Sequence, residues 1–118
     1  MSEKEKTEKT EEQLVAEETA NGADVYVHTF KKPFEWEGVT YDKLTFDFGG
    51  LTAMDMEDID DELAVDNRYA IMPEYSAAYV LRLAAKAAKV HISLIEHLPI
   101  FEGNIIRRKA RAFFMRGE

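Results

Sequence analysis

The acidic run between residues 55 and 62 is the densest set of potential metal ligands in the chain. A calcium loop places its carboxylates on a turn around a central glycine and closes with a bidentate glutamate. This run contains no glycine, and its spacing is helical. We therefore interpret the run as the solvated face of a helix and expect no metal there. Its members are Asp55, Glu57, Asp58, Asp60, Asp61 and Glu62.

The histidines His28, His91 and His97 are the second set that could bind a metal. A zinc site needs a further ligand and a grouping such as i and i+4. His91 and His97 are six residues apart, across a predicted helix boundary. Ordinary surface or half-buried histidines are the better interpretation.

Catalytic motifs are missing from the sequence. No glycine-rich phosphate loop is present, and Gly49-Gly50 lacks the residues that would complete one. None of the serines lies in a nucleophile-elbow motif, and the chain has no cysteine. We expect no catalytic residues, no cofactor and no enzymatic activity.

A line of two tyrosines and three cations is the best candidate for a partner-binding surface. This tyrosine–cation stripe follows a predicted helix at i, i+4, i+7, i+11 and i+14. Tyrosine and arginine are favoured at the anchor points of protein interfaces. A solvated helix face with tyrosines packed at its edge explains the pattern equally well. The stripe consists of Tyr75, Tyr79, Arg82, Lys86 and Lys89.

A basic group near the carboxyl end is the remaining candidate site. Nucleic-acid binding is one interpretation. Cations near the end of a helix also stabilise its dipole without any ligand. The chain as a whole carries a net charge of −8, which would repel phosphates, so we favour the second interpretation and expect no nucleic-acid partner. The group consists of Arg107, Arg108, Lys109, Arg111 and Arg116.

Strand patterns begin at Val25, where apolar and polar side chains alternate up to Phe30. Pro33 is expected to end the pairing of this strand because proline has no N–H for the ladder. Glu37-Gly38 then predicts a tight hairpin turn with glycine at positive φ, and a further strand follows at 44–48. The product is a small antiparallel sheet of two or three strands.

Helix signals occupy the rest of the chain. Thr52 predicts an N-cap, with Asp55 completing a capping box, for a helix that runs to about residue 66. Pro73 is expected to be the first residue of a helix that runs to about residue 89. Ser93 can cap a short helical turn, and Pro99 opens a last helix with Phe101 on its apolar side. The predicted fold class is α+β, with the sheet on the N-terminal side and three to four helices after it.

Composition divides the 118 residues into a tail and one domain. Residues 1–24 are rich in Glu, Lys and Thr and have few large apolar side chains, which predicts a disordered acidic tail. Residues 25–118 are expected to form a single α+β domain. No apolar run approaches the ~18 residues of a membrane span, and the charged first residues lack the apolar stretch that is typical of a signal peptide. We expect a soluble cytoplasmic protein.

Several short segments, taken in order, resemble the phage tail assembly chaperones of Gram-positive phages and prophages. Lys32-Pro33-Phe34 is followed by Glu37-Gly38-Val39-Thr40-Tyr41, and Leu51-Thr52-Ala53-Met54-Asp55-Met56 begins a helix. Met72-Pro73-Glu74 then precedes the run Ala84-Ala85-Lys86-Ala87. Leu98-Pro99 and Phe113-Phe114 match the closing helix of that family. Lys89-Val90-His91 departs from it by lacking the usual glycine between two helices.

The resemblance implies a non-enzymatic role in tail morphogenesis. Such chaperones bind the aggregation-prone tape measure protein and tail tube subunits in the host cytoplasm and are absent from the finished virion of a siphophage or myophage. The chain would be the short form, and a longer frameshifted form of itself would be a further partner. The alternative is a cytoplasmic protein-interaction adaptor or regulator of another partner.

Overall fold

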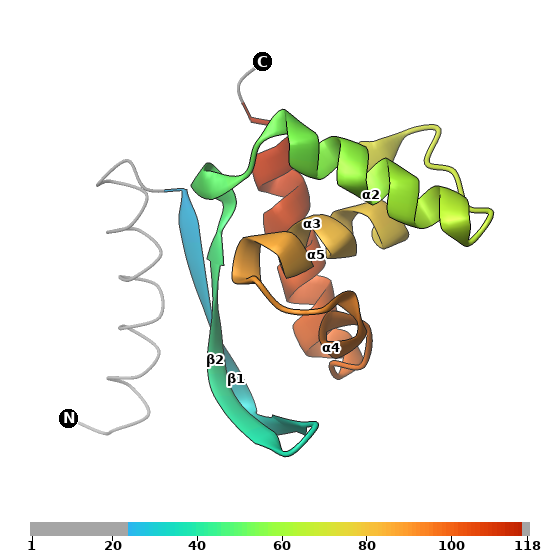
Figure 1. Ribbon diagram of the computed structural model, residues 1–118. Helices are drawn as coiled ribbons and strands as arrows, with labels where there is room; N and C mark the ends of the chain where they lie inside the picture. The colour runs from blue at the N-terminus through green and yellow to red at the C-terminus, as the bar shows by residue number, and fades with distance from the viewer. Residues whose placement is uncertain (1–23, 117–118) are drawn as a thin grey trace.

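The computed structural model describes residues 24–116, in which two antiparallel strands are followed by four α-helices (Figure 1). The α+β class and the element order expected from the sequence are confirmed. The predicted acidic tail, residues 1–24, lies outside the described residues except for Asp24. The elements are β1 (Val25–Trp36), β2 (Val39–Asp47), α2 (Ala53–Val65), α3 (Ala77–Ala88), α4 (Ile92–Glu96) and α5 (Ile100–Phe114), with short 3-10 helices at Phe48–Gly50 and Pro73–Tyr75.

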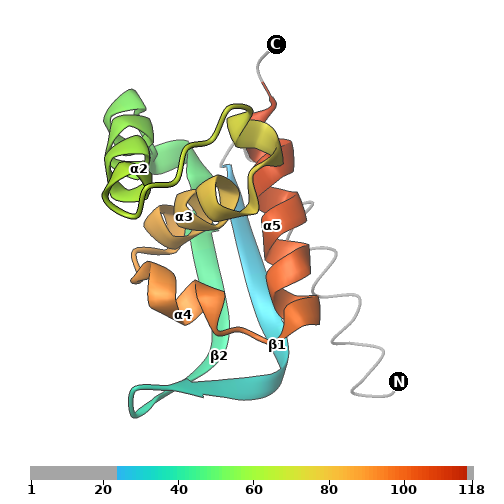
Figure 2. The same cartoon turned by 90° about the vertical axis from the view of Figure 1, so that its right-hand side faces the viewer.

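The hairpin turn is the one that the sequence predicts. Trp36 pairs with Val39 across a two-residue turn, and both turn residues have positive φ, +48° at Glu37 and +79° at Gly38. Such turns match the right-handed twist of the strands, and glycine adopts positive φ without a steric penalty. The turn lies at the far end of the long hairpin, beyond the short helix α4 (Figure 2).

The expectation that Pro33 ends the pairing of the first strand was wrong. β1 continues to Trp36, but the register shifts between Thr29 and Phe34. Residues 30–33 have no partner on β2, so the missing N–H of Pro33 costs no ladder bond. The irregularity bends the hairpin instead of ending it.

One face of the sheet is covered by helices, and the core lies between these two layers (Figures 1 and 2). The alternation predicted for both strands is confirmed, since every second residue is buried in the first half of β1 and in the second half of β2. Its inward-facing members are Tyr26, His28, Phe30, Leu44 and Phe46. Helix α3 crosses behind them and supplies Val80, Ala84, Ala85 and Ala87. The small alanine side chains allow the helix backbone to approach the aromatic rings closely.

Helix α3 begins later than the sequence predicts. Pro73 opens a separate 3-10 turn, and the α-helix starts at Ala77. Ser76 is the N-cap, because its hydroxyl accepts a hydrogen bond from the backbone N–H of Tyr79 at 3.2 Å. The capping bond comes from the serine three residues after the proline, which explains the later start.

Helix α2 begins as predicted. The backbone N–H of Thr52 donates to the Asp55 carboxylate at 2.8 Å, and the reciprocal bond completes the capping box. Ile59 and Leu63 are buried against α3, where they form a second core cluster with Tyr79 and Leu83. This second cluster fixes α2 on the outer side of α3.

The last two helices depart from the sequence expectation at their first residues. The N-cap of α4 is His91, not Ser93, since its Nδ1 accepts from the backbone N–H of Ser93 at 3.0 Å. On α5, Phe101 was expected on the buried side but is 78% exposed. Its neighbour Glu102 occupies the inward position because it has a partner on β1.

Replacing Tyr79 with phenylalanine is expected to reduce the decrease in the free energy of unfolding that occurs at alkaline pH. Burial of the hydroxyl raises the pKa of Tyr79 above 10.0, and the nearby Asp60 carboxylate adds to the rise. A raised folded-state pKa gives a stabilisation that is complete below the unfolded-state pKa and is lost as pH rises through the folded-state value. Urea unfolding of both proteins at about pH 9 and about pH 11 measures how much unfolding free energy each loses between the two pH values. Equal losses in the two proteins would contradict it.

Candidate functional site

The structure divides the tyrosine–cation stripe into a buried part and two exposed ends. Tyr79 is 1% exposed and Arg82 is 6% exposed, because α2 packs over this side of α3. These two residues are therefore not available to a partner in the folded protein. The stripe is therefore not one continuous outer surface, and the binding role of its exposed residues stays a prediction.

The cations in the middle of the stripe hold the acidic end of α2. Lys86 Nζ lies 2.8 Å from Glu62 Oε2, and Arg82 Nε lies 3.5 Å from Glu62 Oε1. The Arg82 guanidinium also lies 3.7 Å from Asp66. Part of the acidic run is thus paired within the fold. No local pattern could reveal this, since Glu62 and Lys86 are 24 residues apart in the chain.

The exposed end at Tyr75 belongs to a group of apolar side chains on the connection between α2 and α3. The guanidinium of Arg111 lies over the Tyr75 ring, 4.4 Å from its centroid, which fixes this connection on α5. Such large apolar side chains in one short segment indicate an interaction surface. We call this group the connection patch: Tyr69 (78% exposed), Ile71 (95%), Met72 (55%) and Tyr75 (59%).

The other exposed end, Lys89, lines a cavity at the tip of the β-hairpin. This hairpin-tip pocket has a volume of about 470 Å³. Two segments that are distant in sequence form its walls, namely the tip of the β-hairpin and the link from α3 to α4. Its lining residues are Trp36, Glu37, Tyr41, Lys89, Val90, His91, Ser93 and Leu94.

Backbone geometry positions both walls of the hairpin-tip pocket. The positive-φ turn directs Trp36 and Tyr41 back toward the helices, and the Trp36 ring stacks on His97 with centroids 4.7 Å apart. Lys89 ends α3 in the left-handed conformation, with φ +58° and ψ +42°. This is the conformation that glycine favours after a helix.

The chemistry of the hairpin-tip pocket suits recognition of an amphipathic segment. Two aromatic side chains offer apolar contact area, while Lys89 offers a cation at the rim. His91 is already engaged as the cap of α4. Among residues 24–116, no cluster of three or more His, Cys, Asp or Glu side chains could hold a metal.

His28 belongs to a buried polar group, contrary to the expectation of a surface or half-buried histidine. His28 is 2% exposed, and its Nε2 lies 2.7 Å from Oε1 of Glu102. The Tyr26 hydroxyl lies 2.8 Å from His28 Nδ1, and the backbone N–H of Lys31 donates to Glu102 Oε2 at 3.1 Å. The group joins β1 to α5. The sequence contains a signal for the burial of Glu102: it lies at a spacing of four from Ile106 and of eight from Ala110, on the helix face that is buried.

The basic group of α5 is largely engaged with neighbouring protein groups. Arg107 donates to Asn104, Arg111 lies over Tyr75, and Arg116 pairs with Asp24. Lys109 Nζ lies 5.2 Å from the centroid of the Tyr26 ring. These contacts give the cations structural roles in addition to the helix-dipole effect expected from the sequence.

Lys89→Gly is expected to raise the free energy of unfolding by about 0.5–1 kcal/mol while removing the cation from the hairpin-tip pocket. The gain arises because a side chain at positive φ is strained and glycine is not. A thermal melt should show a midpoint higher by about 3–6 °C. A lower midpoint would mean that the Lys89 side chain contributes more through its contacts than its backbone loses by strain.

None of the described helices combines the length and the apolar character required to cross a membrane. Comparisons of the chain with protein-family models, with curated proteins and with solved structures found no match.

Proposed function

We propose that this chain is a phage tail assembly chaperone of the short form, which binds tape measure protein and tail tube subunits in the host cytoplasm. One observation carries the proposal. Two segments of the resemblance contribute to the hairpin-tip pocket: Glu37 and Tyr41 come from the hairpin motif, and Lys89 and Val90 directly follow the helix with the Ala-Ala-Lys-Ala run. Tyr41 and Lys89 are 48 residues apart in the chain and line the same cavity.

The connection patch supports the same proposal. It contains Met72 of the Met-Pro-Glu motif, and the core makes little use of its large apolar side chains. An amphipathic helix of a client buries its apolar face against such a surface through side chains at i, i+3 and i+4. Methionine adapts to different partners because its side chain is unbranched and polarizable. The patch could therefore shield a long helical client along successive turns.

Two exposed sites give a test in which folding is little affected. The test variant combines Lys89→Glu with Ile71→Ser and Met72→Ser. We expect its affinity for the tape measure protein of the same phage or prophage to fall at least about tenfold, because it loses two apolar anchors and reverses the rim charge. Binding is measured by titration of the purified chain against an immobilised tape measure segment.

A matched control variant changes the same kinds of residue elsewhere. It combines Lys43→Glu with Val65→Ser, both at exposed positions outside the hairpin-tip pocket and the connection patch. Its affinity should stay within about twofold of the wild-type value, as is usual for residues outside a binding surface. Equal losses in the two variants would contradict the assignment of these surfaces.

A further inference from the structure

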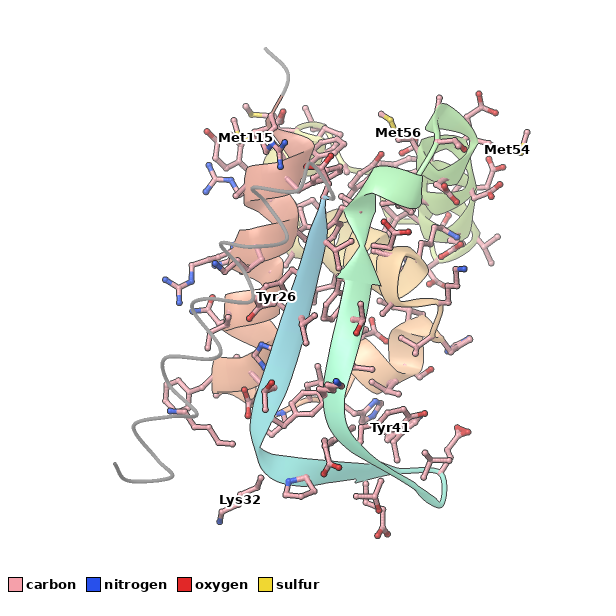
Figure 3. All side chains as sticks on the ribbon, turned by 90° about the vertical axis from the view of Figure 1, so that its left-hand side faces the viewer. Tyr26, Lys32, Tyr41, Met54, Met56 and Met115 are labelled. Carbon is pink, nitrogen blue, oxygen red and sulfur yellow. The ribbon has the colours of Figure 1, made fainter. Side chains whose placement is uncertain are left out.

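A second cavity lies where the described part of the chain begins, between the start of β1 and the last turns of α5. This β1–α5 pocket has a volume of about 190 Å³. Its walls are aromatic, with Tyr26 on β1, Phe48 after β2 and Phe113 on α5. Figure 3 shows Tyr26 at the junction of β1 and α5. Neither the hairpin-tip pocket nor the connection patch shares a residue with it.

Two cations stand on the rim of the β1–α5 pocket. Lys109 Nζ lies 5.2 Å from the Tyr26 ring centroid, and the Arg116 guanidinium lies 5.6 Å from that of Phe113. Arg116 also pairs with Asp24. Because a guanidinium has five N–H donors, Arg116 can also donate to a second carboxylate. Aromatic walls beneath two cations fit a segment with apolar side chains between acidic ones.

The chain itself carries such a segment. Residues 1–23 contain three lysines and seven glutamates, a side-chain charge of −4. Apart from Met1, their large apolar side chains are Leu14 and Val15. This pair has two glutamates on each side, at positions 11 and 12 and at positions 17 and 18. We propose that residues 11–18 dock into the β1–α5 pocket of the same chain, with Leu14 and Val15 against the aromatic walls and the glutamates beside Lys109 and Arg116.

The position of Asp24 makes this docking local. Its carbonyl oxygen accepts backbone hydrogen bonds from Phe48 and Gly49 at 2.8 and 3.1 Å, and its carboxylate pairs with Arg116. The described part of the chain therefore begins at the wall of the pocket. Val15 lies nine residues before Asp24, a reach of up to about 30 Å. A short tether gives an effective concentration on the order of millimolar, so even a weak contact is occupied.

Disulfide trapping tests the docking in the full chain, which has no cysteine of its own. The pair Ala16→Cys with Ala112→Cys puts one thiol in the segment and one on the exposed wall of the pocket. The control pair is Ala16→Cys with Ala64→Cys, on the exposed side of α2. Under mild oxidation we expect the first pair to close within one chain at least about tenfold faster. Equal rates, or a product that is mainly a disulfide dimer, would overturn the proposal.

Two further changes identify what holds the segment. Lys109→Glu with Arg116→Glu, in the first cysteine pair, should slow closure to the control rate, whereas Lys32→Glu with Lys43→Glu should leave it unchanged. Leu14→Ser with Val15→Ser should give the same slowing without altering any residue of the described fold. Closure that stays fast in this last variant would overturn the proposal even if the charge reversal affected folding. No client takes part, so the result does not depend on the proposed chaperone function.

Discussion

Replacing Glu102 with alanine is expected to lower the free energy of unfolding by about 3 kcal/mol. Glu102 is 8% exposed, and its carboxylate accepts from two donors, the ring of His28 and the backbone N–H of Lys31. Its removal leaves Nε2 of the buried His28 and the part-buried N–H of Lys31 without this acceptor, and it loosens α5 from β1. Urea unfolding at neutral pH, monitored by circular dichroism, gives the difference.

Two comparisons make the Glu102 prediction specific. Glu96→Ala, at an exposed glutamate on α4, should cost less than about 0.5 kcal/mol. The double variant His28→Phe with Glu102→Met should recover at least half of the loss, because apolar groups of similar size leave no buried charge unpaired. A Glu102→Ala protein as stable as wild type would show that this buried group does not hold the two elements together.

Replacing Tyr79 with alanine is expected to cost about 3–4 kcal/mol, the second large effect. Tyr79 is 1% exposed and packs with Ile59, Leu63 and Leu83, and its ring also lies 5.5 Å from that of Phe114. The truncation opens a cavity at the contact between α2 and α3. Thermal and urea unfolding of the purified variant measure the cost.

Tyr75→Ala is the matched control, since Tyr75 belongs to the same predicted stripe but is 59% exposed. It should cost less than about 1 kcal/mol, mainly through the loss of its contact with Arg111. If the stripe were an exposed binding surface, both tyrosine substitutions would weaken binding while stability stayed near the wild-type value. Similar small losses in both variants would restore that view and contradict the packing described for α2.

Local signals in the sequence predict a large part of this fold. The Glu37-Gly38 turn and the capping box of Thr52 and Asp55 depend on neighbours within a few residues, so their chemistry can be seen in the sequence. The alternation in both strands predicts the core face in the same way. These features establish the hairpin and the order of the helices.

Features that depend on distant pairs could not be predicted in this way. The stripe on α3 has the composition of an interface, but α2 packs against its middle. Only the packing of the two helices reveals this contact. His28 and Glu102 are hydrogen-bonded although they are 74 residues apart in the chain. The register shift before Phe34 depends on the pairing of the whole hairpin. Helix α3 is covered by the sheet on one side and by α2 on another, so amphipathic periodicity could not identify a free face.

In the predicted tyrosine–cation stripe, the two exposed residues are those at its ends. Lys89 and Tyr75 are both exposed, but they belong to two different surfaces at opposite ends of α3. The hairpin-tip pocket appears only when the hairpin and the α3–α4 link are brought together. Its lining residues belong to separate sequence motifs, and they come together only in the fold.

The most direct test of the chaperone proposal is the solubility of the tape measure protein. The tape measure protein of the same phage or prophage is produced in bacteria alone, with this chain, and with the Lys89→Glu, Ile71→Ser, Met72→Ser variant. We predict that the wild-type chain moves most of the tape measure protein into the soluble fraction and purifies with it, whereas the variant does not. A tape measure protein that remains equally insoluble with and without the wild-type chain would contradict the proposal.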